Sequence, residues 1–365
     1  MKFSKYEHMI IDYIQLPDST YEEATARYNS VGDYLRKDTV ELRDFTPSVR
    51  PQGSFRLGTA IYPQNRDNDL DIDITLICEG ITTDEYSQKE YRDLVRSSVN
   101  NYAEQHNMKK VEDKRRCVRL NYRTSKCKSG FHLDIVPSIE ASSEEKKRIC
   151  EAQGTFYYYS LDITDNKSPD YNKVGGKWLS SNPEGYARWF EERMKEELET
   201  GRIRLREKTG TKDEVPTWKV KTPLQLSVQL LKWHRDCMFS ENANIKPVSI
   251  IITTLAGMVY KEDITSVSEL LKKMRDKLKE MNYKIKNPVD PRENFTDKWA
   301  ENNKLRDSFK EWLNKALNDF TKIENELSDS DAKCILKEAF NYDLDVPEET
   351  PTIIISKKVP KPYGY

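Results

Sequence analysis

The chain has 365 residues, 33% of them charged, and its 60 Lys and Arg residues nearly balance 61 Asp and Glu residues. This length predicts about two domains, and a formal net charge of −1 excludes a uniformly basic surface for holding a long nucleic acid. We find no signal peptide and no apolar run of about 18 residues, and therefore expect a cytoplasmic protein without stable membrane association. Six scattered cysteines predict reduced thiols.

The N-terminal segment, residues 1–38, has a helical pattern. Apolar residues recur at positions 21, 24, 28, 31 and 35, which places them on one stripe of a helix that follows Pro17. Ser19 or Thr20 is the expected N-cap of this helix. We expect the stripe to pack against the body of the molecule.

The stretch from Pro51 to Ile77 is the most informative part of the sequence. Its second half, D-L-D-I-D-I-T-L, alternates carboxylates with apolar residues, which predicts a strand with Asp69, Asp71 and Asp73 on one face. Like charges at this spacing repel one another unless a cation neutralises them, and oxygen ligands suit Mg²⁺. This pattern predicts a metal site.

A second carboxylate-bearing strand follows further along the chain. The runs C-V-R-L-N-Y (117–122) and F-H-L-D-I-V-P (131–137) flank a turn-rich segment and predict a hairpin, with Asp134 in mid-strand. Three carboxylates on neighbouring strands suit phosphoryl transfer assisted by two Mg²⁺ ions. Gly53 would let the backbone approach a phosphate, and Ser54 offers a hydroxyl and an amide N–H.

The remainder of the chain divides at a change in pattern. Residues 140–180 are irregular, a charged helix opens at 181–190, and residues 200–216 are rich in Lys, Glu and Thr and predict a linker. Thr222 and Pro223 mark a helix start. From residue 217 to about 343 the pattern is helical throughout, so we predict an all-α region, followed by a Pro- and Lys-punctuated tail at 344–365.

Taken together, these motifs resemble a known family. Q-G-S-F-x-L-G-T, D-L-D-I-D, F-H-L-D-I-V-P, S-N-P-E-G-Y-A-R-W-F, L-L-K-W-H-R-D, K-P-V-S and N-P-V-D-P-R-E-N-F-T-D-K-W are similar to motifs of the bacterial cGAS/DncV-like nucleotidyltransferases. These enzymes belong to the polymerase-β-like nucleotidyltransferase superfamily and make the signals of CBASS anti-phage defence. The resemblance runs from about residue 17 to 343, and the segment 200–216 has no clear counterpart.

The resemblance implies an α+β fold with a polymerase-β-like sheet lobe, a C-terminal helical lobe and an active site in the cleft between them. The corresponding domains are 1–216, a catalytic lobe that includes the N-terminal helices, 217–343, the helical lobe, and 344–365, an extended tail. The activity it implies is a Mg²⁺-dependent synthase that makes a cyclic di- or trinucleotide second messenger from NTPs, ATP among them. It implies two Mg²⁺ ions, for which Mn²⁺ can substitute.

The resemblance also assigns roles to individual residues. Asp71, Asp73 and Asp134 would bind the metal ions, with Asp134 nearest the attacking hydroxyl. The donor triphosphate would contact Gln52, Gly53 and Ser54. Its phosphate tail would contact Lys232 and Ser249. The expected partners are NTPs, CBASS regulatory or conjugating proteins and an effector that responds to the product, and the tail is a candidate for conjugation.

Several of these residues have a structural alternative. Asp69 is expected to be solvated, Lys232 could be a surface lysine, and Ser249 could merely begin its helix. The basic run from Lys109 to Lys128 is expected to be a solvated hairpin face rather than a polyanion site.

Aromatic and polar residues elsewhere leave the same choice. Trp178, Trp189 and the tyrosines at 157–159 could stack on bases, but packing is expected. His132 and His234 are expected to be structural. The polar segment with Asn287, Glu293 and Asn294 could line a base pocket.

Two other functions stay open at this point. One is a transferase that adds nucleotides linearly or to an RNA or protein acceptor. The other is a nucleotide-sensing or antitoxin-like binding module on the same fold, against which the full set of three carboxylates argues. The ring size, the linkage and the activating signal, nucleic acid or otherwise, are not specified by the residues.

Overall fold

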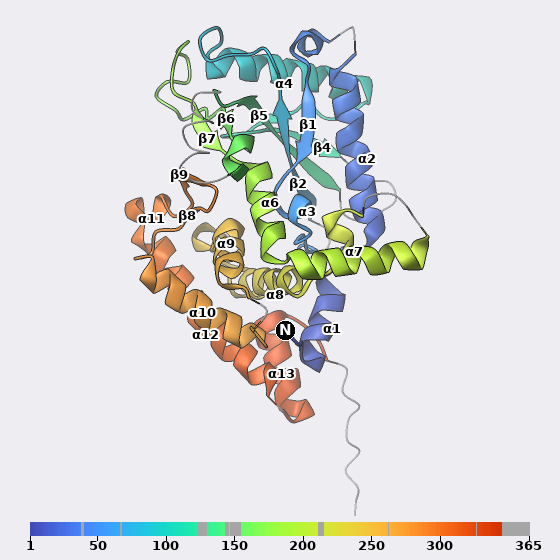
Figure 1. Cartoon of the computed structure of the whole chain (residues 1–365), viewed down its shortest axis with the longest axis vertical. Coiled ribbons are helices and arrows are strands. Elements are labelled where there is room, and N and C mark those ends of the chain that lie inside the picture. The colour runs from blue at the N-terminus through green and yellow to red at the C-terminus, as the bar shows by residue number, and fades with distance from the viewer. Residues whose placement is uncertain are drawn as a thin grey trace, which may run out of the picture.

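The computed structural model has two parts, a twisted sheet with its covering helices and a cluster of helices below it (Figure 1). The structure describes residues 1–37, 40–65, 68–122, 130–142, 146, 155–210, 215–261, 263–325 and 327–344. The tail from residue 345 onward and its predicted conjugation therefore lie outside the described residues.

In the described part of the chain, seven strands form one mixed sheet. Its main path runs β1 (Ser48–Pro51), β2 (Leu70–Ile77), β5 (Phe131–Glu140), β4 (Val118–Tyr122) and β3 (Glu112–Asp113), and β6 (Leu161–Ile163) and β7 (Leu179–Ser181) extend it from β5. Strands β2 and β5 are parallel, and β4 and β5 are antiparallel. The predicted hairpin is confirmed, and the two carboxylate-bearing strands are direct neighbours.

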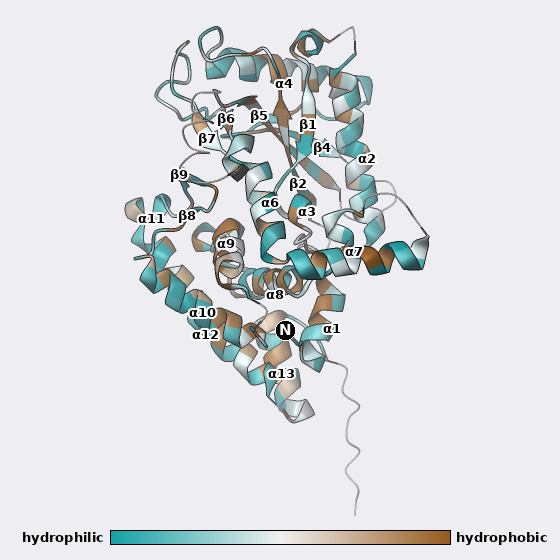
Figure 2. Ribbon diagram, in the orientation of Figure 1, coloured by the Kyte–Doolittle hydropathy of each residue, from teal (hydrophilic) through white to brown (hydrophobic). Residues whose placement is uncertain are grey.

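One face of the sheet carries the core of this part. Leu70, Ile72, Ile74 and Leu76 are buried, as their alternation predicts, and they pack beneath α2 (Asp18–Leu35) and α4 (Gln88–Gln105). Figure 2 shows the apolar colour of the central strands between the more polar helices. The predicted cap of α2 is wrong, because the helix begins at Asp18 and no capping side chain is found among the described residues.

The helical part has its own hydrophobic core. It is built from α8 (Pro223–Met238), α9 (Ser249–Val259), α10 (Val267–Glu280), α11 (Lys298–Glu301), α12 (Asn303–Glu324) and α13 (Asp329–Phe340). Two helices from earlier in the chain, α1 (Lys5–Ile14) and α6 (Pro183–Arg193), contribute side chains to the same core. The domain boundary at residue 216 stays a prediction, and it does not coincide with the division between the two cores.

Two predictions for this half of the chain are wrong. The region after residue 217 is not all-α, because β8 (Lys286–Asn287) and β9 (Asp290–Asn294) form a two-stranded hairpin. The predicted linker at 200–216 is helical up to residue 209, as α7 (Lys195–Thr209), whose Lys, Glu, Arg and Leu residues favour a helix even with little burial. No helix among the described residues is both long and apolar enough to cross a membrane.

Side chains of α8 connect the helical part to the sheet part by hydrogen bonds. The helix starts at Thr222 and Pro223 as predicted, with a capping box. Along one stripe of its surface, Gln225 Nε2, Gln229 Nε2 and Lys232 Nζ donate hydrogen bonds of 3.0, 2.9 and 2.8 Å. Their acceptors are the carbonyl oxygens of residues 57, 60 and 59, at the C-terminal end of the short helix α3 (Gly53–Leu57) and just after it. This stripe fixes the C-terminal end of the helix that begins with Gly53 and Ser54.

Candidate active site

The three predicted carboxylates lie together on the polar side of the sheet. Asp73 on β2 is directly opposite Asp134 on β5, and Asp71 lies two residues earlier on the same face of β2. The Asp71 side chain is 62% exposed and that of Asp134 is 14% exposed. The site therefore grades from solvent at Asp71 to the interior at Asp73 and Asp134.

The electrostatics of Asp73 reflect this crowding. Burial, together with the charges of Asp134 and Asp71, raises the pKa of Asp73 to about 7, although the charges of Arg119 and Lys232 oppose this rise. A carboxyl group with this pKa is only about half ionised near neutral pH, and an approaching cation favours its ionised form. The local charge balance therefore favours a cation ligand.

Arg119 on β4 provides one positive charge inside the cluster. It lies opposite Asp134 in the register of β4 and β5. Its Nε donates to Asp134 Oδ1 at 2.7 Å and its Nη2 donates to Asp134 Oδ2 at 2.8 Å. The same Nη2 lies 3.2 Å from Asp71 Oδ1. The sequence predicts Arg119 only as part of a basic run. Its position in the alternation of C-V-R-L-N-Y could also have predicted that its side chain faces Asp134.

Asp69 and His132 hold this arrangement from the side. Asp69 is not simply solvated as predicted, because its Oδ1 accepts from the Gly130 amide at 2.7 Å and its Oδ2 lies 2.7 Å from His132 Nε2. Arg119 Nη1, which can only donate, bonds His132 Nδ1 at 2.8 Å, so the His132 proton lies on Nε2 facing Asp69. His132 thus connects Asp69 to Arg119.

The start of α3 approaches Asp73 closely. Gly53 has φ +63°, and a Cβ built there would lie 2.6 Å from Asp73 Oδ2. The Gln52 amide donates to the Asp73 carbonyl at 2.8 Å, and the Gln52 side chain accepts from Thr75 Oγ1 at 2.8 Å. Glycine is required here both by the backbone conformation and by the space.

Two pockets meet at this group of carboxylates. One, of about 540 Å³, is lined by Gln52, Gly53 and Asp73 together with residues of α6 and of the β8–β9 hairpin. The other, of about 580 Å³, is lined by Ser54, Asp69 and Asp71 from the sheet part and by Lys232, Arg235, Asp236, Lys246 and Ser249 from the helical part. The first pocket has an apolar character suited to a nucleoside. The second places three cations of the helical part, with the carboxylate of Asp236, opposite the carboxylates of the sheet part, and we call it the cation-rich pocket after these cations.

Lys232 and Ser249, assigned by resemblance, both line the cation-rich pocket. Burial of Lys232, together with the Arg235 charge, lowers its pKa to about 7. It is therefore not the surface lysine of the alternative reading. Ser249 Oγ accepts from Arg235 Nη1 at 2.7 Å and begins α9 without capping it.

The pocket that is lined by Gln52, Gly53 and Asp73 also contains a carboxylate from the helical part. Glu293 and Asn294 of β9 and Asn287 of β8 line it, as the sequence allowed. Burial raises the pKa of Glu293 to about 7, and Asn287 Nδ2 donates to Glu293 Oε2 at 2.7 Å. In contrast, Trp178 and Trp189 are buried in the two cores, which confirms packing as their role. His234, buried against Asp319, is structural as expected.

The three carboxylates are chemically suited to bind a divalent metal ion, but their present arrangement is less suited to it. Among the described residues, no three His, Cys, Asp or Glu side chains are arranged to hold a metal ion. Both oxygens of Asp134 are occupied by Arg119. Asp73, whose pKa the charges of Asp134 and Asp71 help to raise, nevertheless forms with these two residues the oxygen donor set expected for a hard cation.

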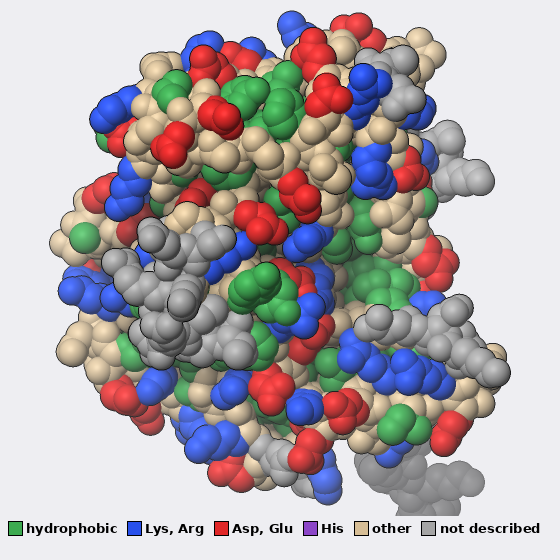
Figure 3. Space-filling model, turned by 45° about the horizontal axis from the view of Figure 1, so that its top comes forward, with side chains coloured by type: hydrophobic (Ala, Val, Ile, Leu, Met, Phe, Trp, Pro, Cys, Tyr) green, Lys and Arg blue, Asp and Glu red, His purple; other side chains and the backbone are tan. Residues whose placement is uncertain are grey.

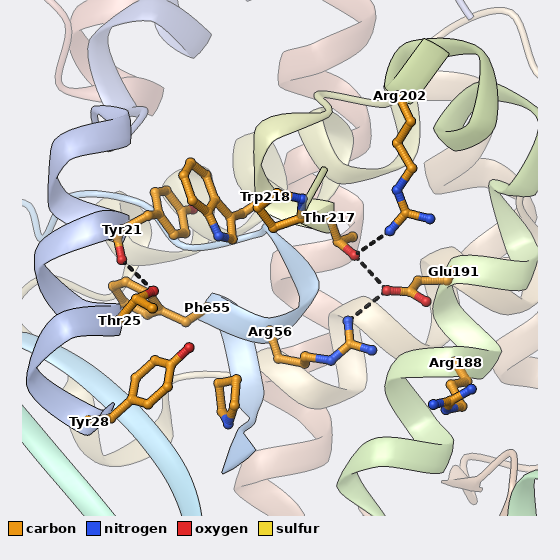
Figure 4. A pocket seen from close by; sticks show the side chains of 12 residues that line it. Tyr21, Thr25, Tyr28, Phe55, Arg56, Arg188, Glu191, Arg202, Thr217 and Trp218 are labelled. Carbon is orange, nitrogen blue, oxygen red and sulfur yellow. Dashed lines mark hydrogen bonds and ion pairs between the residues drawn. The ribbon is translucent and has the colours of Figure 1, made fainter. Parts of the chain in front are cut away.

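A third pocket of about 410 Å³ lies beside the active site and is lined by residues of α2, α3, α6 and α7 (Figure 4). There Arg56 Nη1 donates to Glu191 at 2.6 Å, and Glu191 accepts from Thr217 Oγ1 at 2.6 Å. Tyr21 and Trp218 stack with ring centroids 4.7 Å apart. These contacts brace the outer side of α3.

The basic run around the hairpin does not form a free cationic surface in the part that the structure describes. Arg115 and Arg116 pair with Asp165, and Lys114 pairs with Glu112. Residues 123–129 of this run lie outside the described residues. Acidic and basic side chains are interspersed over the face shown in Figure 3.

Comparison with known proteins agrees with this architecture. Residues 47–137, which span β1 to β5, match the family model described as the nucleotidyltransferase domain of the cyclic GMP-AMP synthase DncV-like proteins. This match identifies residues 47–137 as a DncV-like nucleotidyltransferase domain. A c-di-GMP synthase of Roseivirga ehrenbergii is 28% identical over 339 residues, which cover 90% of this chain and 81% of that protein.

Solved structures of other proteins share the fold over most of the chain. The cyclic dinucleotide synthase CdnG of Bradyrhizobium diazoefficiens is 23% identical over 79% of this chain and 68% of its own. Its structure in complex with GTP superposes with a TM-score of 0.66 at 21% identity, covering 92% and 93% of the two chains. CdnC of E. coli, in complex with a HORMA protein, superposes with a TM-score of 0.59 at 14% identity, covering 92% and 96%. The predicted α+β fold with a nucleotidyltransferase sheet and a helical C-terminal part is confirmed.

The close approach of Gly53 to Asp73 yields a test by substitution. In Gly53→Ala the added methyl meets the movable end of the Asp73 side chain, so we expect it to displace the carboxyl group rather than to unfold the sheet. Nucleotide turnover should fall by about tenfold or more, because displacing a reacting group by even 1 Å is costly. Steady-state assay with NTPs and Mg²⁺ measures the loss.

Gly175→Ala is the matched control. Gly175 also has positive φ, at +72°, but no atom lies within 4 Å of its built Cβ. Both variants should lose about 1–2 kcal/mol of unfolding free energy from the left-handed backbone, while only Gly53→Ala loses turnover. Equal turnover in the two variants would contradict the contact with Asp73.

Proposed function

We propose that this protein joins nucleoside triphosphates into a cyclic dinucleotide that contains guanosine, as a signal in anti-phage defence. The observation that carries the proposal is the pairing of Asp73 with Asp134 at the junction of two pockets, beside Gly53. The descriptions of the Roseivirga and Bradyrhizobium relatives as cyclic dinucleotide synthases support the product class.

In the proposed reaction, a ribose hydroxyl of one nucleotide attacks the α-phosphate of another. A P–O bond forms, the bond to pyrophosphate breaks, and the hydroxyl proton passes to the Asp134 carboxylate. In a second step of the same kind, a ribose hydroxyl of the other nucleotide attacks the remaining α-phosphate, releases its pyrophosphate and closes the ring. Asp134 lies deeper than Asp71, which suits a group that faces the acceptor hydroxyl in a site that excludes water.

The cation-rich pocket would hold the triphosphate. Ser54 and Ser249 offer hydroxyl groups, and Lys232 reaches it from the helical part. Because burial lowers the Lys232 pKa to about 7, an arriving triphosphate would restore the charge of this ammonium group. Two Mg²⁺ ions held by Asp71, Asp73 and Asp134 would supply charge neutralisation of the reacting phosphates. Mn²⁺ is an expected substitute.

The pocket that reaches Glu293 would hold the base. A carboxylate that keeps one oxygen toward the pocket accepts hydrogen bonds, and the Watson–Crick edge of guanine presents N1–H and N2–H donors. Adenine presents a donor and an acceptor instead. The pocket volume of about 540 Å³ is within the range of about 300–1,000 Å³ for small-ligand sites.

The direct test uses labelled NTPs with Mg²⁺. The wild-type protein should yield a phosphatase-resistant product, and Asp71→Asn with Asp73→Asn should abolish it without loss of the folded state. The double variant Asp84→Asn with Glu85→Gln removes two exposed carboxylates from a turn and is the matched control.

Two outcomes would count against the proposal. Product formation by the Asp71 and Asp73 double variant would show that the carboxylates are not the reactive site. A product whose terminal phosphate is trimmed by phosphatase would indicate a linear or acceptor-directed transferase.

Base selection gives a second test. In Glu293→Gln the side chain offers one acceptor and one donor, which matches adenine better than guanine. The ratio of kcat/KM for GTP to that for ATP, measured near pH 8 where Glu293 is ionised, should fall by about tenfold or more.

Glu301→Gln, an exposed change of the same charge on α11, should leave this ratio unaltered. An unchanged ratio in Glu293→Gln would remove Glu293 from base selection.

Regulatory partners follow by analogy alone. The E. coli relative CdnC has been solved with a HORMA protein, and we propose a CBASS protein as the class of partner for this chain. A downstream effector would respond to the cyclic product.

A further inference from the structure

The guanidinium of Arg119 faces the three carboxylates, and a role for it in metal binding rests on the proposed function. The guanidinium makes a two-pronged contact with Asp134, a contact with Asp71 and a hydrogen bond to His132. Its side chain is only 20% exposed. A fork geometry of this kind is among the strongest pairings available to a carboxylate.

This contact competes with a metal ion. The same Asp134 oxygens that should ligate a cation now accept from Arg119, and a positive charge lies between Asp134 and Asp71. A divalent ion entering beside Asp73 would be repelled by the guanidinium and would find Asp134 occupied. The guanidinium and the metal therefore exclude each other at Asp134.

The sheet offers Arg119 a second acceptor on its other side. In the register of β3 and β4, Arg119 lies directly opposite Glu112, just as it lies opposite Asp134 in the register of β4 and β5. Directly opposed residues of adjacent strands project from the same face. The Glu112 side chain is 49% exposed.

Glu112 already pairs with one cation, Lys114, whose Nζ lies 2.6 Å from Glu112 Oε2, so Arg119 would share this carboxylate with Lys114. Hydrogen bonds from Lys114 and Asn121, and to a smaller extent the charge of Arg119, hold the pKa of Glu112 below its ordinary value. It is therefore an anion on the edge strand. A rotation of the Arg119 side chain across β4 exchanges one carboxylate partner for another without moving the backbone.

We propose that Arg119 is a displaceable cation that occupies the metal site of the nucleotide-free protein and moves from Asp134 to Glu112 when a metal–nucleotide complex enters. The nucleotide-free protein consequently binds divalent ions weakly. Metal binding becomes coupled to the arrival of the triphosphate, whose charge compensates for the shift of Arg119. His132, held by Asp69, returns the guanidinium to its place after product leaves.

The experiment measures Mn²⁺ binding to the nucleotide-free protein by electron paramagnetic resonance, which needs no turnover. Arg119→Gln should bind Mn²⁺ at least about tenfold more tightly than the wild type. The substitution removes the guanidinium whose two hydrogen bonds to Asp134 compete with the metal ion. Arg115→Gln removes an equal charge from the same edge, where it pairs with Asp165, and should stay within about twofold of the wild type. Wild-type affinity in Arg119→Gln would overturn the proposal.

Glu112→Gln provides an independent variant should Arg119→Gln fail to fold. Without its second acceptor, Arg119 should remain at Asp134, so Mn²⁺ affinity in the presence of a non-hydrolysable GTP analogue should fall by about threefold or more. Unchanged affinity would overturn the proposal. If the wild type with the analogue binds no Mn²⁺ at all, the proposed function itself fails. This outcome distinguishes a failure of the proposed function from a failure of the proposal for Arg119.

Discussion

The mutual repulsion of three carboxylates on two adjacent strands is the constraint on which the site depends. Asp71, Asp73 and Asp134 are brought together by the parallel pairing of β2 and β5, which also buries the apolar faces of both strands. The packing of the core thus forces negative charges into proximity. Arg119 and Lys232 are the cations that the fold provides against this repulsion.

These two cations come from different parts of the molecule. Arg119 belongs to the sheet, whereas Lys232 belongs to α8 and reaches the carbonyl of Thr59. The stripe of Gln225, Gln229 and Lys232 therefore has two consequences. It fixes the segment after α3, and it sets one wall of the cation-rich pocket. A motion of α8 relative to the sheet would change both the loop around Gly53 and the charge near Asp73.

The local pattern of the sequence was sufficient for the strands and their carboxylates. Alternation predicted the buried face of β2 and placed Asp134 on a neighbouring strand, because strand period is a property of a few consecutive residues. The positions of Lys232 and Ser249 came only from family resemblance, and the structure places both in one pocket with Asp71. Their roles stay predictions.

What sequence alone did not predict depends on contacts between distant segments. Arg119 and His132 acquire their meaning from strand pairing, and α1 joins the helical core across more than 200 residues of chain. The β8–β9 hairpin was missed because its polar residues lack an alternating pattern. Helix α7 was not predicted because it buries little apolar surface, so its sequence has no clear apolar stripe.

The most direct measurement is a crystal structure of the protein with Mn²⁺ and a non-hydrolysable GTP analogue, using anomalous scattering to locate the metal. The account predicts an anomalous peak bounded by Asp71, Asp73 and Asp134, with the triphosphate beside Ser54 and Lys232 and the Arg119 guanidinium withdrawn from Asp134. A triphosphate bound elsewhere, or no metal at these three carboxylates, would contradict it.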